Sequence, residues 1–459
     1  MDPIERDCFW LAGLAPREVT PLAAPATADI VVVGAGFTGL WCALFLKEMA
    51  PEREVAVVEQ GIAAYGASGR NAGMLSETVD HSHALAIQHF GMGEARRLAR
   101  VGEENVAEML AFLAERGIQC DWEPTGRLMV ALTDGHIEEC HKNIAIAEQL
   151  GITGFRYLDG EAVRAEVHSP LYRGAVEVNR GGICDPAKLT DGLRREAVRQ
   201  GVRVYERSAV RGIEEEGGKL RVRSAAGGSL LAGHVVLATS AYTHHLLPSV
   251  LHRFIPLYDY IMVSEKLSAA QWQAIGWRKR QGITDGRTSF NYYRPTADGR
   301  VLWGTSEAAY HGNNRVHPAC DHSPSHYASL EASWKRHFPD AADLRWEYKW
   351  GGAICSTTRL TPFFGRAFHN RLSYGLGFTG HGLGSTRIAG RILAHLALNR
   401  PGDVLALPLV TKPPFPYPPE PIRGWAVNAV TRALRQVDEG RPPNLMLRAL
   451  DRLGIGFSS

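Results

Sequence analysis

The sequence of 459 residues lacks a large charge excess of either sign, and it has no low-complexity segment. Its 51 Lys and Arg are nearly balanced by 48 Asp and Glu, which leaves a formal net charge of +3. Because a nucleic-acid-binding protein normally carries a basic excess or a basic stripe, we expect no nucleic-acid partner. The hydrophobic content of 45% excludes a disordered or fibrous chain and predicts a well-buried core.

Closely paired cysteines are also lacking. The seven cysteines are dispersed, and no two have the two-residue gap of a zinc knuckle or redox pair. We therefore predict reduced, mostly structural thiols in a reducing compartment. His317, Cys320 and His322 fall within one short loop, but no second ligand cluster accompanies them, so we expect no metal site.

The sequence shows neither a targeting segment nor a membrane-spanning run. Residues 1–7 are acidic and precede no apolar core, so they do not resemble a signal peptide. The stretch 30–46 is uncharged over 17 residues, but glycines interrupt it, and a membrane span needs about 20 apolar residues. We predict a buried strand, a turn and a helix there, and a cytoplasmic protein without stable membrane insertion.

Glycine, by contrast, is abundant, and the first glycine cluster lies between a predicted strand and a predicted helix. Asp29–Val33 has the β-branched composition of a buried parallel strand, and Leu40–Lys47 forms an apolar helix. Glu54–Val58 predicts a second strand, which ends at an acid. Such a turn places a pyrophosphate at a helix N-terminus, and the acid holds ribose hydroxyls and disfavours a 2′-phosphate. The predicted dinucleotide contacts are Gly34, Gly36, Phe37, Thr38, Gly39, Glu59 and Gln60.

A second glycine-rich loop, Gly66–Met74, follows the ribose acid directly. A nicotinamide enzyme does not need a loop of this kind at that position. The arrangement resembles the FAD-dependent amine oxidases of the D-amino acid oxidase, glycine oxidase and sarcosine oxidase superfamily, especially the γ-glutamylputrescine oxidase-like branch. The resemblance implies that the loop runs along the pyrophosphate and the flavin ring; the alternative is a solvated Gly/Ser loop. The implied FAD contacts are Gly66, Ala67, Ser68, Arg70, Asn71, Ala72, Gly73 and Met74.

A third cluster, Gly375–Arg391, precedes a predicted helix over 388–398, and the resemblance covers about residues 25–400. In the flavoenzymes that the chain resembles, a Gly-Phe-Ser/Thr-Gly-His-Gly segment lies beside the pyrimidine edge of the flavin. A helix N-terminus there stabilises negative charge on the reduced ring. The implied contacts are Gly380, His381, Gly382, Leu383, Gly384, Ser385 and Thr386, with Val210 at the adenine edge and Thr239 over the dinucleotide.

The resemblance also implies an α/β architecture with two domains built from separated segments. A Rossmann-like FAD-binding domain, of the glutathione reductase and p-hydroxybenzoate hydroxylase type, is expected from residues 1–80, 171–244 and 346–410. A substrate domain with an antiparallel sheet is expected from 81–170 and 245–345. Residues 411–459 form a Pro-rich, helical C-terminal extension, which we expect to dock on its own domain, on a partner or on a membrane surface.

Two positions that bind a substrate carboxylate in relatives differ in this chain. Amino-acid oxidases commonly have Pro-Arg where this chain has Pro295-Thr296, and sarcosine oxidases have a Lys where it has Gly384. These differences argue against a plain α-amino acid and favour a γ-glutamylputrescine-like or N-alkyl aminophosphonate-like amine. Arg294 lies on the same strand face as Thr296 and could partly compensate, or it could pair with an acid across the hairpin.

The expected reaction is hydride transfer from a small primary or secondary amine to flavin N5, followed by imine hydrolysis to an aldehyde plus amine or ammonia. An aromatic, poorly solvated pocket would favour the neutral amine. Candidate lining residues are Tyr258, Tyr260, Tyr292, Tyr293 and Trp350, which are otherwise ordinary core residues, and the candidate charged groups are Arg294 and His381, the latter otherwise a loop histidine.

We expect tightly bound, noncovalent FAD. Relatives that attach FAD covalently use a His where Asn71 stands here, or a Cys a few residues upstream of Cys355. Reduced flavin is expected to pass its electrons to dioxygen or another acceptor.

Three rival functions remain open at this stage. One is a sarcosine, glycine or D-amino acid oxidase or dehydrogenase. Another is a flavoprotein subunit that only relays electrons. The third is a maturation or tRNA-modification domain, which the balanced charge disfavours.

Overall fold

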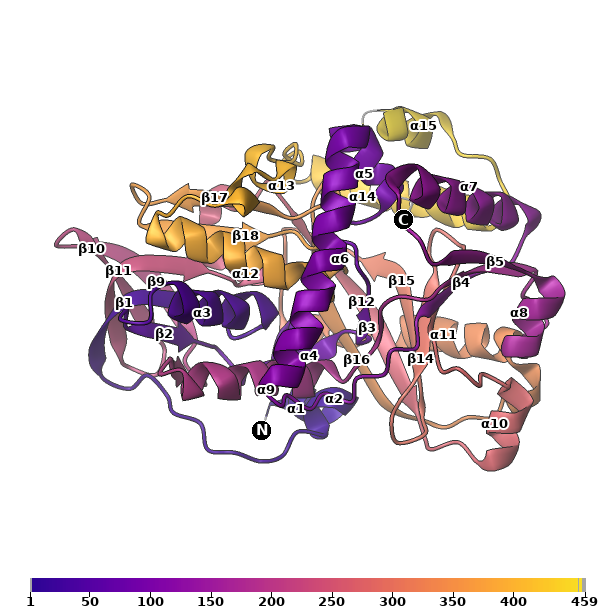
Figure 1. Ribbon diagram of the computed structural model, residues 1–459, viewed down its shortest axis with the longest axis horizontal. Helices are drawn as coiled ribbons and strands as arrows, with labels where there is room; N and C mark the ends of the chain where they lie inside the picture. Colours follow the sequence, from indigo (N-terminus) through magenta and orange to yellow (C-terminus); the bar gives the residue numbers. More distant parts are fainter. Residues whose placement is uncertain (1, 453, 456–459) are drawn as a thin grey trace.

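The computed structural model describes residues 2–452, 454 and 455. An eight-stranded, mainly parallel sheet has the order β17-β18-β11-β1-β2-β8, and β9 and β10 extend from β11 (Figure 1). Its strands are β1 (Pro25–Val33), β2 (Val55–Val58), β8 (Arg203–Tyr205), β9 (Val210–Glu216), β10 (Lys219–Ser224), β11 (Ser229–Leu237), β17 (Phe363–Ala367) and β18 (Leu372–Leu376). β1 pairs in parallel with β2 and β11, which brings segments about 200 residues apart in the chain together.

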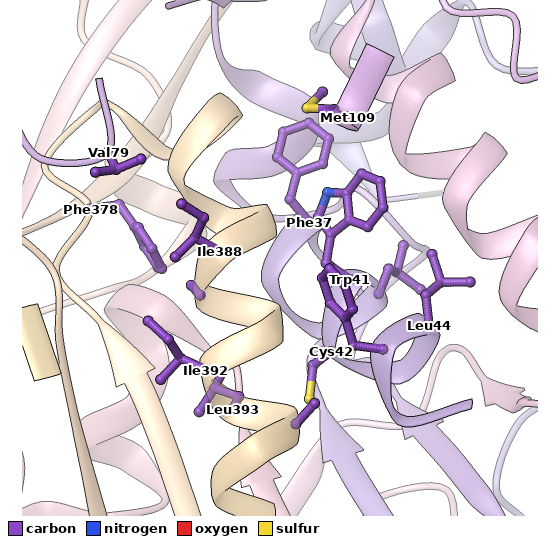
Figure 2. Close-up of a cluster of buried hydrophobic side chains, with 14 of the residues drawn as sticks. Phe37, Trp41, Cys42, Leu44, Val79, Met109, Phe378, Ile388, Ile392 and Leu393 are labelled. Carbon is purple, nitrogen blue, oxygen red and sulfur yellow. The ribbon is translucent and has the colours of Figure 1, made fainter. Parts of the chain in front are cut away.

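Helices α3 (Phe37–Met49) and α12 (Gly382–Leu398) pack side by side against this sheet. Figure 2 shows their contact, where Trp41 of α3 and Ile392 of α12 belong to one buried cluster. The close approach depends on Gly390, because a Cβ there would lie 2.6 Å from the Trp41 Cβ. The two glycine-rich helix starts are thereby held in one layer of the molecule.

The second eight-stranded sheet is mainly antiparallel, with the order β16-β12-β15-β14-β13-β4-β6-β5. Its strands are β4 (Arg127–Ala131), β5 (Phe155–Asp159), β6 (Gly174–Val178), β12 (Ile255–Ser264), β13 (Gly282–Asp285), β14 (Asn291–Pro295), β15 (Val301–Ala309) and β16 (Trp346–Ser356). The predicted hairpin of β14 and β15 is confirmed by their antiparallel pairing. The domain boundaries expected from the sequence differ from the structure at β6 and β16. Residues 171–244 and 346–410 were assigned to the FAD-binding domain, but β6 and β16 pair within the second sheet.

The long helix α6 runs between the two sheets in the view of Figure 1 and packs against α12. The other helices are α1 (Pro3–Asp7), α2 (Phe9–Ala12), α4 (Ala67–Arg70), α5 (His83–Phe90), α6 (Met92–Glu115), α7 (Asp134–Leu150), α8 (Gly160–Glu166), α9 (Pro186–Arg199), α10 (Ala269–Ile275), α11 (Pro324–His337) and α13 (Pro408–Thr411). A small sheet joins β3 (Met74–Leu75) to β7 (Gly182–Ile183), and 3₁₀ turns span Ser240–His245, Pro248–Val250, Pro318–Cys320, Pro339–Ala341 and Asp403–Ala406.

The C-terminal extension contains α14 (Ile422–Asp438) and α15 (Leu445–Arg452). Asp438 accepts hydrogen bonds from the backbone N–H groups of Thr288 and Ser289, at 2.7 and 2.8 Å. Arg435 pairs with Glu307 of β15 at 2.6 Å. The extension therefore docks on the chain's own second sheet, which is one of the placements expected for it.

None of the described helices combines the length and apolar composition needed to span a bilayer. All seven cysteines are buried and unpaired, so the prediction of thiols rather than disulfides agrees with the structure.

Candidate active site

A cavity of about 1880 Å³ is lined by residues of both sheets and of α14. One end is formed by the turn after β1 and by the ends of β2 and β11. The middle is formed by the loops 66–74 and 380–384. The far end is formed by β4, β12, β14 and α14. Its volume exceeds the roughly 300–1,000 Å³ of a drug-sized ligand site, so it can accept a dinucleotide and a further small molecule.

At the first end, the turn after β1 requires glycine for steric reasons. Gly34 has φ +108°, and a Cβ there would lie 2.7 Å from the Ala238 carbonyl oxygen. A Cβ on Gly39 would collide with the Gly34 carbonyl oxygen. Helix α3 starts at Gly36 without a side-chain cap, and the Phe37 N–H donates to Ser68 Oγ at 2.9 Å. The other amide groups of this helix start are available to an anionic ligand.

Glu59 follows β2, as predicted, and its carboxylate lines the same end of the cavity. It accepts hydrogen bonds from the backbone N–H groups of Ala35 and Gly61, at 2.8 and 2.9 Å. Burial raises its pKa above the ordinary glutamate value. Gln60, Val210 and Thr239 line this end as well, so these three and Glu59, all predicted to contact the dinucleotide, are brought together.

The second loop is held in place by Arg70, which is 4% exposed. Its guanidinium pairs with Asp321 at 2.9 Å and donates to the Tyr65 and Gly351 carbonyl oxygens. Its Nη2 atom is buried without a hydrogen-bond partner in the described chain, and the residue lines the cavity. This atom is a donor left over for a ligand. Gly66, Ala67, Ser68, Asn71, Ala72 and Met74 also line the cavity, whereas Gly73 does not.

Asn71 shapes the same loop through its side chain. Its Oδ1 accepts the Gly73 N–H at 2.8 Å, and its Nδ2 donates to the Ala67 and Ser68 carbonyl oxygens. These bonds explain why an amide stands at this position.

The third loop presents the start of α12 to the cavity. His381 is the N-cap residue, and its side chain does not cap the helix. Its Nδ1 lies 3.2 Å from the Thr379 carbonyl oxygen, and burial lowers its pKa. Its ring centroid lies 4.3 Å from that of His81. The uncapped helix start therefore faces the cavity next to uncharged imidazoles, together with Gly380, Gly382, Leu383, Gly384 and Thr386, while Ser385 is buried outside the lining.

Strand alternation decides which aromatic candidates reach the cavity. In β12, Leu257, Asp259 and Ile261 line it, and Tyr258 and Tyr260 point to the opposite face. The Tyr258 and Tyr260 hydroxyls instead bond to the segment 317–320. The prediction that Tyr258 and Tyr260 line the pocket is therefore wrong, because the residues next to them along the strand line it instead.

Trp350, Tyr293 and Arg294 also lie outside the cavity lining. The Trp350 Nε1 donates to the Arg70 carbonyl oxygen at 2.9 Å, and Tyr293 stacks on Trp303. Arg294 is buried and donates to the carbonyl oxygens of Gly73 and Cys184, at 3.2 and 2.6 Å. Its guanidinium supports the second loop from behind, and no acid of residues 2–452 lies within 4.0 Å of it, so the alternative ion pair across the hairpin does not form.

Tyr292 alone among the predicted tyrosines lines the cavity. Its hydroxyl donates to Asp259 Oδ2 at 2.7 Å. Asp259 was not among the residues predicted from the sequence, although its position as a single acid within the apolar stretch Ile255–Val263 was a signal for it. Burial raises the Asp259 pKa to about 7.

The glycine turns, the leftover Arg70 donor and two uncapped helix starts fit a dinucleotide with a flavin ring. The fold and the site together define an FAD-binding α/β oxidoreductase. The chain belongs to the DAO family of FAD dependent oxidoreductases. The model of this family matches residues 29–396. The family membership and the FAD requirement expected from the sequence are thus confirmed.

Two relatives illustrate the similarity in sequence. Gamma-glutamylputrescine oxidoreductase of Escherichia coli is 32% identical over 372 residues, which cover 81% of this chain and 83% of the relative. A probable oxidoreductase OrdL of Rhizobium meliloti is 27% identical and covers 90% of this chain and 94% of its own length.

Among solved structures, glycine oxidase from Geobacillus kaustophilus has a TM-score of 0.70 at 20% identity. The superposition covers 83% of this chain and 97% of that one. At this identity the likeness supports the fold.

Proposed function

We propose that the chain oxidises a small primary or secondary amine that is not a plain α-amino acid. The first substrate class is a γ-glutamylputrescine-like amine, and the second is an N-alkyl aminophosphonate-like amine. When bound, FAD supplies the acceptor for the hydride that leaves the amine. Hydrolysis of the imine then gives an aldehyde plus amine or ammonia, and dioxygen or another acceptor takes the electrons.

The observation that carries this proposal is the absence of a carboxylate clamp at the expected positions. Thr296 is buried and donates to Asp298 at 2.6 Å, outside the cavity lining. A Cβ on Gly384 would lie 2.7 Å from the Ser76 carbonyl oxygen, so no lysine fits there without a backbone shift.

Two arginines at the far end of the cavity already have acidic partners. Arg127 and Arg287 line the cavity, but each pairs with a buried carboxylate, Glu77 at 2.9 Å and Asp285 at 2.6 Å. An α-carboxylate entering this region would have to compete with these ion pairs.

Two further features favour an elongated amine as the substrate. The similarity to gamma-glutamylputrescine oxidoreductase favours that substrate class. One face of α14 contributes mainly apolar residues to the cavity, including Ala426, Val427, Val430 and Leu434. This face suits the methylene chain of a diamine derivative.

The test is the visible spectrum of the purified flavoprotein under anaerobic conditions. We expect γ-glutamylputrescine or an N-methyl aminophosphonate to bleach the flavin, and sarcosine, glycine and D-alanine to leave it oxidised. Bleaching by sarcosine or D-alanine would contradict the argument from the missing clamps and favour an amino-acid oxidase. A flavin that no amine bleaches would favour an electron-relay subunit.

A further inference from the structure

Asp259 and Tyr292 form an isolated polar pair on the cavity face of the second sheet. Asp259 of β12 lies opposite Gly352 of β16, and Tyr292 comes from β14, two strands away from β12. The ring of Tyr292 crosses β15 at Gly304, where an added Cβ would lie 2.8 Å from the tyrosine hydroxyl oxygen. Gly304 leaves room for the Tyr292 ring, and both Asp259 and Tyr292 line the cavity, so a ligand in the cavity can approach the pair.

The Asp259 carboxylate of this pair has no cationic partner in the described chain. Tyr292 is its only side-chain hydrogen-bond partner within residues 2–452, and no Arg, Lys or His of that part of the chain lies within 4.0 Å of the carboxylate. The nearest charged groups on neighbouring elements have acidic or basic partners of their own, because Arg70 pairs with Asp321 through Nη1 and Glu307 pairs with Arg435; the Arg70 Nη2 atom has no hydrogen-bond partner in the described chain. A negative charge on Asp259 is therefore left for a cation from outside the chain.

The Asp259–Tyr292 pair lies next to the loop 66–74, which is expected to contact the flavin. A Cβ on Gly352, the strand partner of Asp259, would lie 3.4 Å from Arg70 Cδ, and Tyr292 packs in the same cluster as Ala72. Both Arg70 and Ala72 belong to the loop that fits the flavin. A substrate nitrogen held by Asp259 would thus be held beside this loop.

An alkylamine arrives mainly as its ammonium form, because its pKa is near that of lysine, about 10.4. The form that can release a hydride is the neutral amine, so a proton must first leave the nitrogen. The imidazoles of His81 and His381 are poor acceptors, because burial lowers the pKa of both. Burial has the opposite effect on a carboxylate, and the raised Asp259 pKa, about 7, suits it to accept a proton near neutral pH.

We propose that the Asp259–Tyr292 pair binds the reacting ammonium group of the substrate and accepts its proton. One N–H bond of the ammonium breaks and one O–H bond forms on the carboxylate, while the electron pair stays on nitrogen. The Tyr292 hydroxyl orients the carboxylate and stabilises its charged form. The proton later returns to solvent. This assignment rests on the proposed amine oxidation and names a catalytic residue for it.

The test uses the FAD-loaded protein and two matched carboxylate variants, Asp259→Asn and Asp80→Asn. Asp80 is the control because it is buried with a pKa also raised to about 7, yet it lies outside the cavity lining. The ligand is tert-butylamine, which has no α-hydrogen and cannot be oxidised. Its binding is measured by the change in the flavin spectrum.

In the unsubstituted protein and in Asp80→Asn, we expect affinity for tert-butylamine to fall about tenfold for each pH unit below 7, because a protonated carboxyl no longer attracts an ammonium group. In Asp259→Asn, affinity should be low and independent of pH over this range. Flavin reduction by a reactive amine should slow by about 10²–10⁴-fold in Asp259→Asn near neutral pH. It should recover when the pH exceeds the pKa of the free amine.

Tyr292→Phe provides a second measurement. We expect it to keep the pH dependence of tert-butylamine binding and to move the midpoint to higher pH, because the hydrogen bond that lowers the Asp259 pKa is lost. An Asp259→Asn protein that retains both the pH dependence and the reduction rate would overturn the assignment and leave amine oxidation intact. A protein whose flavin no amine reduces would overturn the proposed function and this role with it.

Discussion

Arg70 joins three separate parts of the chain at the candidate site. Its guanidinium contacts Asp321 of the loop before α11, the Gly351 carbonyl of β16 and the Tyr65 carbonyl of its own loop. The fork geometry of arginine serves all three at once, which a lysine ammonium cannot do. The residue that the sequence suggested as an FAD contact therefore also determines the geometry of the second loop.

Replacement of Arg70 by Met should destabilise the protein by about 3–5 kcal/mol, because it leaves the Asp321 carboxylate buried without its partner. We expect FAD to dissociate more readily as well. Denaturant unfolding and flavin fluorescence would measure the two effects. Arg70→Lys serves as the control and should lose less stability, since it keeps the charge; equal losses in both variants would contradict the ion-pair explanation.

His234 predicts a pH dependence of stability. It is buried in β11, and its Nε2 lies 3.0 Å from Ser373 Oγ. Burial lowers its pKa to about 4 from an ordinary value of 6.5. The unfolded chain therefore binds the proton more readily, so the contribution of this residue is complete above about pH 6.5 and is lost as the pH falls towards 4.

At pH 5 this loss should reach about 2 kcal/mol from His234 alone. Urea unfolding at pH 7.5 and pH 5 would measure it, and His234→Asn should show a smaller difference between the two conditions. His369, whose side chain is 84% exposed, is the control. A pH dependence that changes equally in His369→Asn would contradict burial as the cause.

At the scale of elements, the alternation of side chains along β12 determines which of them line the cavity. The strand Ile255–Ser264 is largely apolar on both faces. The sequence therefore could not say whether the even-numbered or the odd-numbered residues meet the cavity. The answer depends on which face of β12 is covered by α11, and this is a tertiary contact.

Helix α14 forms part of the cavity wall, although it lies beyond the residues that match the family. Val430→Trp should narrow the cavity and raise KM at least tenfold for a long amine, with little change for a short one. Steady-state kinetics with amines of increasing length would measure this effect. Trp425→Ala, at a position 68% exposed and outside the lining, should leave both KM values unchanged; a uniform fall in kcat in Val430→Trp would instead indicate a general disturbance.

At the scale of the whole molecule, the FAD site spans segments that are far apart in the chain, so bound FAD links them. Burial raises the pKa of the Cys355 thiol, which keeps it protonated and unreactive. We expect acid precipitation to release all of the yellow colour into the supernatant, as noncovalent binding requires. Colour that stays in the pellet would contradict this expectation.

Removal of FAD should also lower the unfolding free energy by about 4 kcal/mol relative to protein with free FAD at a thousand times its Kd. Thermal unfolding of the flavin-free and reloaded protein would measure the difference. A melting temperature that is the same in both would mean that FAD does not join the separated segments.

The sequence by itself determined the three glycine-rich clusters expected to contact FAD and their order along the chain. The positive φ of Gly34, the contact of Gly39 with the Gly34 carbonyl and the helix start of α12 are local features, so they are readable without the fold. Three glycine-rich clusters in a single chain were therefore enough to predict the α/β class, the family and the cofactor.

Only the tertiary structure decided which residues line the end of the cavity that is proposed to hold the substrate. Arg294 was a plausible clamp by residue type, yet its guanidinium faces the Gly73 and Cys184 carbonyls, whereas Asp259, which was not predicted, lines the cavity. The assignment of β6 and β16 to the second sheet, and of α14 to the cavity wall, likewise came from long-range packing. Such contacts depend on which faces meet in space, and this information is distributed over residues hundreds of positions apart.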